Sequence, residues 1–291
     1  GLPMGLCWLG ALLAGSPVGI LVWTGGRDAQ YAGLPPGLPP GPGEDVPVVV
    51  GGKEPTVAVQ FNPPPGVQPG MVGTILAEQV NLVDVTATLV DLAVRGHLPI
   101  ARDDRGIFRA DDWVLSRTAP PASAVPLAPY EQVLIDSIFA GGNQIALSQL
   151  KNRFKPTLDA VERLMYEEVV ERGWFRRSPE RARAGWTGLG TLLIFGSVFA
   201  AFFLGGMLSG LFADSGFPIS PTWVLVGGGV VSGLIVRALG QRMAARTASG
   251  SAMLAQSRGF ERYIATAEAN QIKWEEAQGV LSNFLAFAIV F

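Results

Sequence analysis

Three apolar, uncharged stretches constrain the fold of this chain more than any other feature of its sequence. They lie at residues 6–23, within the uncharged run 184–213, and at residues 217–236. A helix needs about 20 mostly apolar residues to cross a bilayer, and a segment in lipid must be helical to satisfy its backbone groups. A signal peptide is the alternative for the first stretch, but neither a basic segment before it nor a small-residue cleavage site is visible. The sequence therefore predicts three transmembrane helices.

The arginines beside the second and third stretches predict the orientation of the protein. The turn between these stretches contains one charged residue, Asp214. Lys and Arg accumulate on the cytoplasmic side of membrane helices, so the turn is expected outside and both flanks inside. We expect a multi-pass plasma membrane protein with its N-terminus outside and with residues 25–184 and the C-terminus in the cytoplasm. The flanking arginines are Arg27, Arg172, Arg176, Arg177, Arg181, Arg183, Arg237, Arg242 and Arg246.

Each apolar stretch also contains a pair of glycines four positions apart. Such pairs let helix backbones approach closely, so the helices are expected to pack on each other or on a second copy, forming a homo-oligomer in the lipid bilayer. No Asp, Glu, Lys, Arg or His lies within any stretch, which disfavours a transporter or pump. The pairs are Gly15 with Gly19, Gly206 with Gly210, and Gly229 with Gly233.

Residues 25–70 are rich in proline and glycine and are expected to form a cytoplasmic linker. Prolines at this density favour extended backbone without hydrogen-bonded partners; a proline motif that binds a partner protein is the alternative. Within this region, Thr56–Phe61 is typical of one short strand, which the following prolines end.

Two segments of similar order follow the linker. In the first, Asp84 is expected to cap a helix over 85–95 that Gly96 ends, before strands at 97–101 and 112–117. In the second, helices over 130–140, 147–154 and 157–172 lead through Gly173 into an extended Trp174–Phe175. In both segments, a helix ends at a glycine and a strand follows. This order predicts two winged-helix-like units, at 71–118 and 129–183, and a positive φ at both glycines.

These elements together predict an α-helical membrane protein with an α+β cytoplasmic domain. The expected order is transmembrane helix 1 (1–24), the linker (25–70), the two winged-helix-like units, a hairpin of transmembrane helices 2 and 3 (184–240), and an amphipathic cytoplasmic region (241–291). Residues 247–279 alternate apolar and charged residues at helical spacing, indicating helices on the cytoplasmic domain or the membrane surface. The final run, 280–291, is too short to span, so it is the start of a further span or a docked helix.

Six segments carry a family resemblance: 26–28 (GRD), 33–36 (GLPP), 67–74 (VQPGMVGT), 84–98 (DVTATLVDLAVRGHL), 171–175 (ERGWF) and 259–264 (GFERYI). Together they resemble the bacterial YciQ-like predicted membrane proteins, catalogued as domain of unknown function 2207. The resemblance covers nearly the whole chain. It implies architecture but no activity, and it implies an extracytoplasmic β-rich domain before the first span and often a glycine-rich tail, so this chain is expected to be a fragment.

The sequence contains no motif with a recognised catalytic mechanism. It has no phosphate-binding glycine loop, no His-Glu-x-x-His and no Gly-x-Ser-x-Gly. The single Cys7 excludes an internal disulfide, and His97 has no second His or Cys to share a metal. We therefore expect no enzyme, no cofactor, and no catalytic, cofactor-binding or metal residues. The carboxylates Asp103, Asp104, Asp111 and Asp112 are interpreted as a solvated turn rather than a cation site, and Asp84 and Asp91 as capping or exposed residues.

Charge decides between the two leading functions. Residues 72–117 contain five basic and seven acidic side chains, and residues 129–183 contain nine and eight. Neither segment has the basic surface that DNA binding requires, although Lys151, Arg153 and Lys155 form one small cluster. The sequence therefore favours a membrane-anchored scaffold or signal-relay protein whose winged-helix-like units bind a protein partner; a membrane-tethered DNA-binding transcriptional regulator is the alternative.

Overall fold

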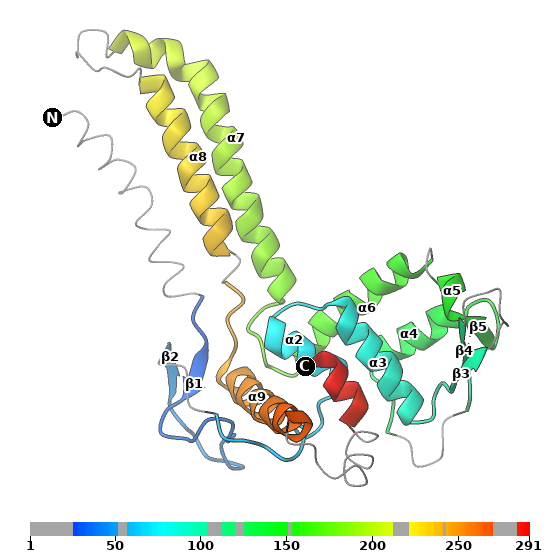
Figure 1. Cartoon of the computed structure of the whole chain (residues 1–291). Helices are drawn as coiled ribbons and strands as arrows, with labels where there is room; N and C mark the ends of the chain where they lie inside the picture. Colours follow the sequence, from blue (N-terminus) through cyan, green and yellow to red (C-terminus); the bar gives the residue numbers. More distant parts are fainter. Residues whose placement is uncertain are drawn as a thin grey trace. The chain divides into compact units, whose positions relative to one another are not determined.

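The computed structural model describes residues 26–51, 57–103, 112–119, 125–150, 153–211, 221–240, 243–269 and 284–291. The chain divides into two compact units that are discontinuous in sequence. We call them the hairpin unit (1–29, 48–51 and 175–247) and the core unit (30–47, 52–174 and 248–291). The described residues are mainly helical, with two small sheets (Figure 1). The predicted first transmembrane helix lies outside the described residues, and the predicted domain boundaries stay predictions.

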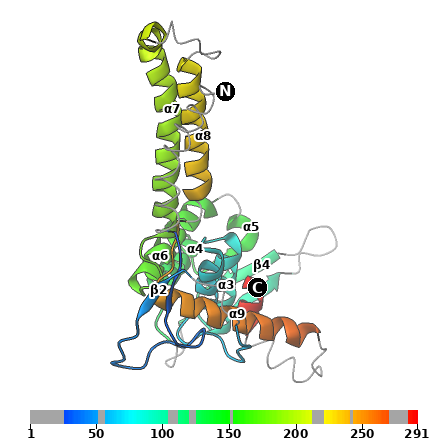
Figure 2. The same cartoon turned by 90° about the vertical axis from the view of Figure 1, so that its left-hand side faces the viewer.

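Two long helices make up most of the described hairpin unit. Helix α7 (Pro179–Leu211) and helix α8 (Pro221–Gly240) lie side by side in both views (Figures 1 and 2). Within α7, Pro179–Met207 has a mean hydropathy of 2.0 over its most apolar window and is the one described helix long and apolar enough to cross a membrane. The apolar part of α8, Val226–Gly240, is shorter. The second predicted transmembrane helix is therefore a continuous apolar helix, and the third stays a prediction.

Glycines allow α7 and α8 to approach each other closely. A Cβ added to Gly229 would collide with Ser197 of α7, and one added to Gly233 would lie 2.6 Å from a backbone oxygen of α7. Added Cβ atoms at Gly206 and Gly210 would meet nothing within 4 Å. Of the predicted glycine pairs, the one in α8 therefore serves packing within the hairpin, while the pair in α7 leaves an open surface.

The core unit is built from pairs of helices. Helix α2 (Pro69–Ala77) packs on α3 (Leu82–Val94) and on α9 (Ala248–Ala269), and α4 (Pro129–Ile138) packs on α6 (Phe154–Glu171). Burial of apolar side chains between these helices drives the folding of the unit. The fully buried apolar side chains include Met71, Ile75, Leu92, Leu134, Val161, Met165 and Phe260.

A three-stranded antiparallel sheet joins the two segments that were predicted as separate units. Strand β3 (Ile100–Asp103) pairs with β4 (Asp112–Ser116), which pairs with β5 (Gln144–Ala146). Strand β5 directly precedes the short helix α5 (Leu147–Leu150) and was not predicted. The two segments therefore share one sheet.

The predicted C-terminal ends of α3 and α6 are confirmed, but the predicted start of α3 is not. Gly96 and Gly173 have φ of 83° and 70°, which confirms the predicted left-handed positions after α3 and α6. The predicted cap of α3 was wrong, because the helix begins at Leu82 with Asn81 as N-cap, and Asp84 is its third residue.

The linker region contains more structure than predicted. Ala29–Tyr31 (β1) and Val48–Val50 (β2) form a two-stranded sheet. The prediction of a strand over 56–61 is wrong, because residues 57–60, which the structure describes, are not in a strand. Instead, the Gln60 amide donates to the carbonyl oxygen of Gly259 at 3.0 Å. A Cβ at Gly259 would collide with the backbone of this segment, so the glycine permits extended chain to lie on α9.

The described C-terminal residues dock on the core unit. Residues 284–290 are helical, and the Phe287 ring lies edge-on to Phe260 of α9, with centroids 5.5 Å apart. Phe284 and Phe291 contact the same ring at 5.1 and 5.9 Å. The sequence left open whether the final run begins a further span or forms a docked helix. Residues 284–290 form a docked helix.

Candidate functional site

The hairpin unit contains a junction formed by Asp28, Ala29, Phe175 and Arg246. The Arg246 amide and its Nη1 donate to the two carboxylate oxygens of Asp28, at 2.7 and 3.0 Å. The Ala29 amide donates to the Arg246 carbonyl oxygen at 3.0 Å. Phe175 forms an antiparallel bridge with Arg246, and the guanidinium carbon lies 5.7 Å from the Phe175 ring centroid. The Arg246 side chain is only 7% exposed.

These contacts bring together three segments that adjoin the apolar stretches of the sequence. Asp28 follows the predicted first span, which ends at residue 23. Phe175 precedes α7, and Arg246 follows α8. A part-buried charge needs a partner, and hydrogen bonds between charged groups contribute about 1.5–3 kcal/mol each. Arg246 therefore fixes the two other segments beside its own.

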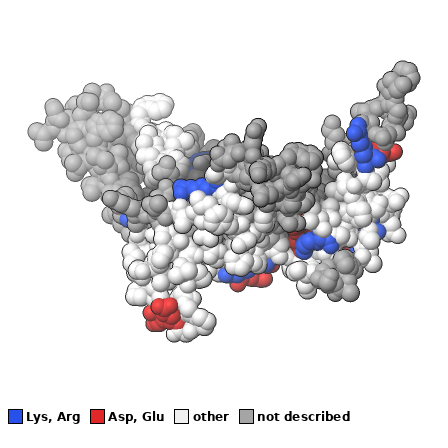
Figure 3. Space-filling model, turned by 60° about the horizontal axis from the view of Figure 1, so that its bottom comes forward, with Lys and Arg blue, Asp and Glu red and all other residues white. Residues whose placement is uncertain are grey.

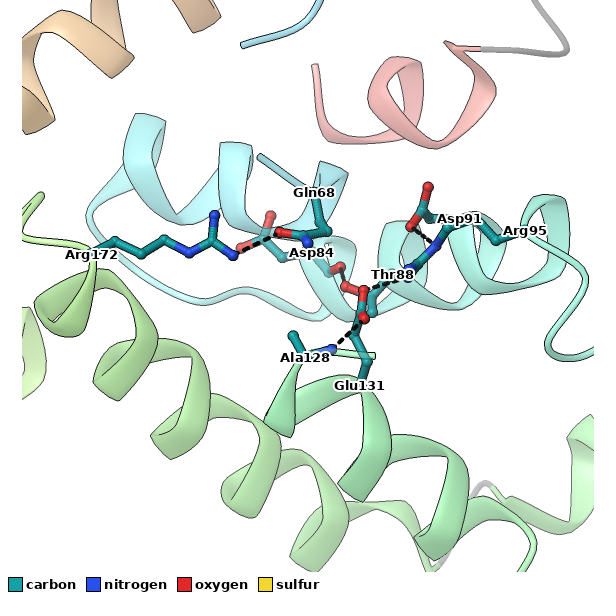
Figure 4. Close-up of polar contacts among 8 residues, drawn as sticks. All are labelled: Gln68, Asp84, Thr88, Asp91, Arg95, Ala128, Glu131 and Arg172. Atoms are coloured by element: carbon teal, nitrogen blue, oxygen red, sulfur yellow. Dashed lines mark hydrogen bonds and ion pairs between the residues drawn. The ribbon is translucent and has the colours of Figure 1, made fainter. Parts of the chain in front are cut away.

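The core unit contains a second group of buried charges, drawn in Figure 4. Glu131 of α4 is completely buried and accepts a hydrogen bond from the Ala128 amide at 2.8 Å. It also pairs with Arg95, which pairs in turn with Asp91 at 2.8 Å. Burial raises the pKa of Asp91, and the nearby Arg95 charge opposes this. Arg95 thus ties the end of α3 to the beginning of α4.

Asp84 is a buried carboxylate with a shifted pKa. It is 2% exposed, and its Oδ2 accepts a hydrogen bond from the Asn81 amide at 2.8 Å. Its Oδ1 occupies the space that a Cβ at Gly73 of α2 would need. Burial raises the pKa of Asp84 to about 6, and the hydrogen bond from Asn81 lowers it in part. The carboxylate therefore titrates in a narrow space between α2 and α3.

The ends of α3 and α6 are built in the same way. Arg95 pairs with Asp91 four residues earlier, and Arg172 pairs with Glu168 four residues earlier at 2.6 Å. Arg172 also donates to the Gly66 carbonyl oxygen at 2.6 Å. Each arginine precedes a glycine with positive φ. The two halves of the core unit thus repeat one local structure.

The other residues singled out in the sequence do not come together in one site within the described part of the chain. His97 is 4% exposed, burial lowers its pKa, and no group of His, Cys, Asp or Glu in the described ranges could hold a metal ion. The interpretation as a solvated turn is wrong for Asp112, which is buried in β4 and accepts hydrogen bonds from the Trp113 amide at 2.9 Å and from Ser148. Asp103 ends β3, and Arg153 and Lys155 are exposed at the start of α6. The remaining members of these groups, Asp104, Asp111 and Lys151, and also Cys7, lie outside the described residues.

Sequence reasoning missed the pairing of Asp28 with Arg246 and of Arg95 with Glu131. In the sequence, Asp28 stands out only as part of a segment that carries the family resemblance, and Arg246 only as one of the arginines beside the apolar stretches. An acid at the third position of a helix, as at Glu131 after Pro129, is a recognised capping signal and could have placed that carboxylate at the start of α4. No local signal identifies either arginine partner.

The long apolar helix α7, which packs on the shorter apolar helix α8, fits a protein that inserts into a membrane. The chain belongs to the family described as predicted membrane proteins of domain of unknown function 2207, whose C-terminal domain matches residues 58–291. This confirms the resemblance to domain of unknown function 2207 for the segments within 58–291; the YciQ-like name and the matching segments at 26–28 and 33–36 stay predictions. No curated protein and no solved structure matches the chain significantly.

Proposed function

We propose that this protein is a membrane-anchored scaffold or signal-relay protein. Three transmembrane helices would hold it in the plasma membrane, with the N-terminus outside and a cytoplasmic domain of winged-helix-like units that bind a protein partner. The observation that carries the proposal is the junction at Arg246, where segments adjoining all three apolar stretches of the sequence meet. A displacement of any of the three helices would act on this residue.

Insertion of α7 into lipid is supported by its surface. Phe195, Phe199 and Phe202 are 69%, 65% and 83% exposed. Soluble monomers rarely expose contiguous apolar patches of this kind. At helical spacing these rings lie opposite Ser197, which faces Gly229 of α8, and opposite the buried Ala201. This fits a helix with one side on its neighbour and the other in lipid.

Binding of a protein partner is supported by the sheet of the core unit. The register pairs Ile100 with Leu115 and Arg102 with Trp113, and directly paired residues point to the same face. Leu115 is only 2% exposed, so the open part of this face is the part at Ile100 and Trp113. Ile100 and Trp113 are 38% and 47% exposed. Exposed Trp is enriched among residues that anchor protein interfaces, so this face is the proposed contact.

The DNA-binding alternative has less support. On the face shown in Figure 3, the described Lys and Arg side chains form small separated patches, several of them beside Asp or Glu. Arg95, Arg117 and Arg172 are each held by a carboxylate, which leaves fewer positive charges for phosphate groups.

Orientation is tested by labelling of introduced cysteines. In a Cys7→Ser background, Ser215→Cys should react with an impermeant thiol reagent on intact cells, and Ser123→Cys only after permeabilisation. Labelling of position 123 but not 215 on intact cells would reverse the proposed orientation.

The relay is tested by hydrogen exchange of the full chain in lipid nanodiscs. Asp28→Asn should accelerate amide exchange in residues 26–31, and also in 243–247 and in α9, which begins at Ala248. Asp45→Asn is the matched control, because Asp45 is exposed in the same region. Acceleration confined to residues 26–31 would contradict a relay.

The partner surface is tested by a photo-crosslinking amino acid placed at Trp113 in cells. A discrete protein adduct should form from this position and not from Asp159, an exposed residue of α6. Equal products from both positions, or none from position 113, would reject the sheet face as the contact.

A further inference from the structure

Three arginines at the beginning of α7 have no partner within the described protein. Arg176 and Arg177 precede the helix, and Arg181 lies in its first turn. All three are exposed, and none makes a hydrogen bond or ion pair with another described residue. Arg172 and Arg246, by contrast, are held by Glu168 and Asp28.

The position of these arginines opposes helix stability. The N-terminal end of a helix carries a partial positive charge, so acidic side chains or anions are favoured there and basic ones are not. The first turn of α7 contains a single acid, Glu180. Because α7 extends from Pro179 to Leu211, its first peptide amides add to the positive potential of the arginines. An anion from outside the chain would relieve this repulsion.

The apolar character of α7 indicates which anion is near. Pro179–Met207 is long and apolar enough to cross a membrane, so a helix inserted by this segment starts at the level of the lipid phosphates. Guanidinium groups bind phosphate through paired hydrogen bonds. We propose that Arg176, Arg177 and Arg181 form a binding site for the headgroups of anionic phospholipids. This inference rests on the proposed insertion of α7 and adds a lipid specificity to it.

The test uses the full chain purified in a non-ionic detergent. Native mass spectrometry would measure retention of added phosphatidylglycerol, of phosphatidylcholine, and of phosphatidylglycerol in the presence of inorganic phosphate. The wild type should retain phosphatidylglycerol in preference to phosphatidylcholine. The triple variant Arg176→Gln, Arg177→Gln, Arg181→Gln should retain it on the order of tenfold less, because each basic residue near a membrane surface contributes to anionic lipid binding.

A second triple variant controls for net charge. Arg153→Gln, Lys155→Gln and Arg163→Gln remove the same charge from exposed positions at and within α6. This variant should retain phosphatidylglycerol like the wild type. An equal loss in both variants would show non-specific charge attraction and overturn the proposal.

Other outcomes are equally decisive. Equal retention of both lipids by the wild type would reject the site even if the glutamine variant did not fold. Complete displacement of phosphatidylglycerol by inorganic phosphate would show a site for free anions and overturn the lipid assignment. Extraction of the wild type from membranes by alkaline carbonate would contradict the proposed function itself, whereas retention in the membrane without lipid preference would contradict only this inference.

Discussion

The buried carboxylate of Asp84 leads to a prediction about stability and pH. Asp84→Asn removes the charge but keeps a side-chain oxygen that can accept the hydrogen bond from Asn81. Asparagine also fits the space beside Gly73 that the carboxylate occupies. The variant should therefore be more stable than the wild type wherever Asp84 is ionised.

The sign and size follow from the pKa of Asp84, which burial raises from 3.8 to about 6. The native state binds the proton more tightly than the unfolded state, so this group stabilises the protein at low pH, and that stability is lost as pH rises through about 6. At about 1.4 kcal/mol per pKa unit, and reduced for partial solvent screening, the loss is about 1.5–3 kcal/mol.

Thermal unfolding of the full chain in detergent, followed by circular dichroism, measures this effect. The difference in unfolding free energy between variant and wild type should grow by about 1.5–3 kcal/mol from pH 4 to pH 8. Other titrating groups, such as Asp91 and His97, are common to both proteins and cancel in the difference. Asp159→Asn, which changes an exposed carboxylate of α6, should show no such growth. A difference for Asp84→Asn that is constant with pH would refute the reasoning.

Three further predictions concern helix ends, helix packing and nucleic acid. Gly96→Ala and Gly173→Ala should each lower the free energy of unfolding by about 1 kcal/mol, because alanine is strained at positive φ; unchanged thermal midpoints would contradict this. Gly229→Leu should overpack the α7–α8 contact and cost about 1–3 kcal/mol, whereas Gly206→Leu faces open space; equal yields of monodisperse protein from the two variants would count against the packing. In gel-shift titrations at physiological salt, the full chain should bind duplex DNA no more tightly than about 10⁻⁴ to 10⁻⁶ M; tight, salt-sensitive binding dependent on residues 72–173 would favour a DNA-binding regulator.

Local features of the sequence predicted local structure well. Apolar periodicity placed α3, α4 and α6 within a few residues of their bounds, because burying one helix face requires regular spacing. Gly96 and Gly173 were correctly assigned because positive φ at a helix end strongly favours glycine. The predicted beginning of α3 was wrong because an aspartate at the third position of a helix can accept a hydrogen bond from the N-cap amide. In the sequence, such an aspartate cannot be told from one at the N-cap itself.

Contacts between distant residues were not predictable from one sequence. Strand β5 contains three residues, too few to show a period, and its pairing with β4 depends on the whole fold. Asp28 and Arg246 are separated by 218 positions, and Arg95 and Glu131 by 36. Complementary charges at such separations have many possible partners, so the pairing is decided by tertiary packing.

The repeated helix end explains how one local structure can serve two purposes. After α3, the chain turns at Gly96 and enters β3, which pairs with β4 inside the core unit. After α6, it turns at Gly173 and within two residues reaches Phe175, which pairs with Arg246 in the hairpin unit. The left-handed glycine and the ion pair of Arg172 with Glu168 fix the direction in which the chain leaves α6. The chain therefore leaves α6 from an ordered helix end that is fixed within the core unit.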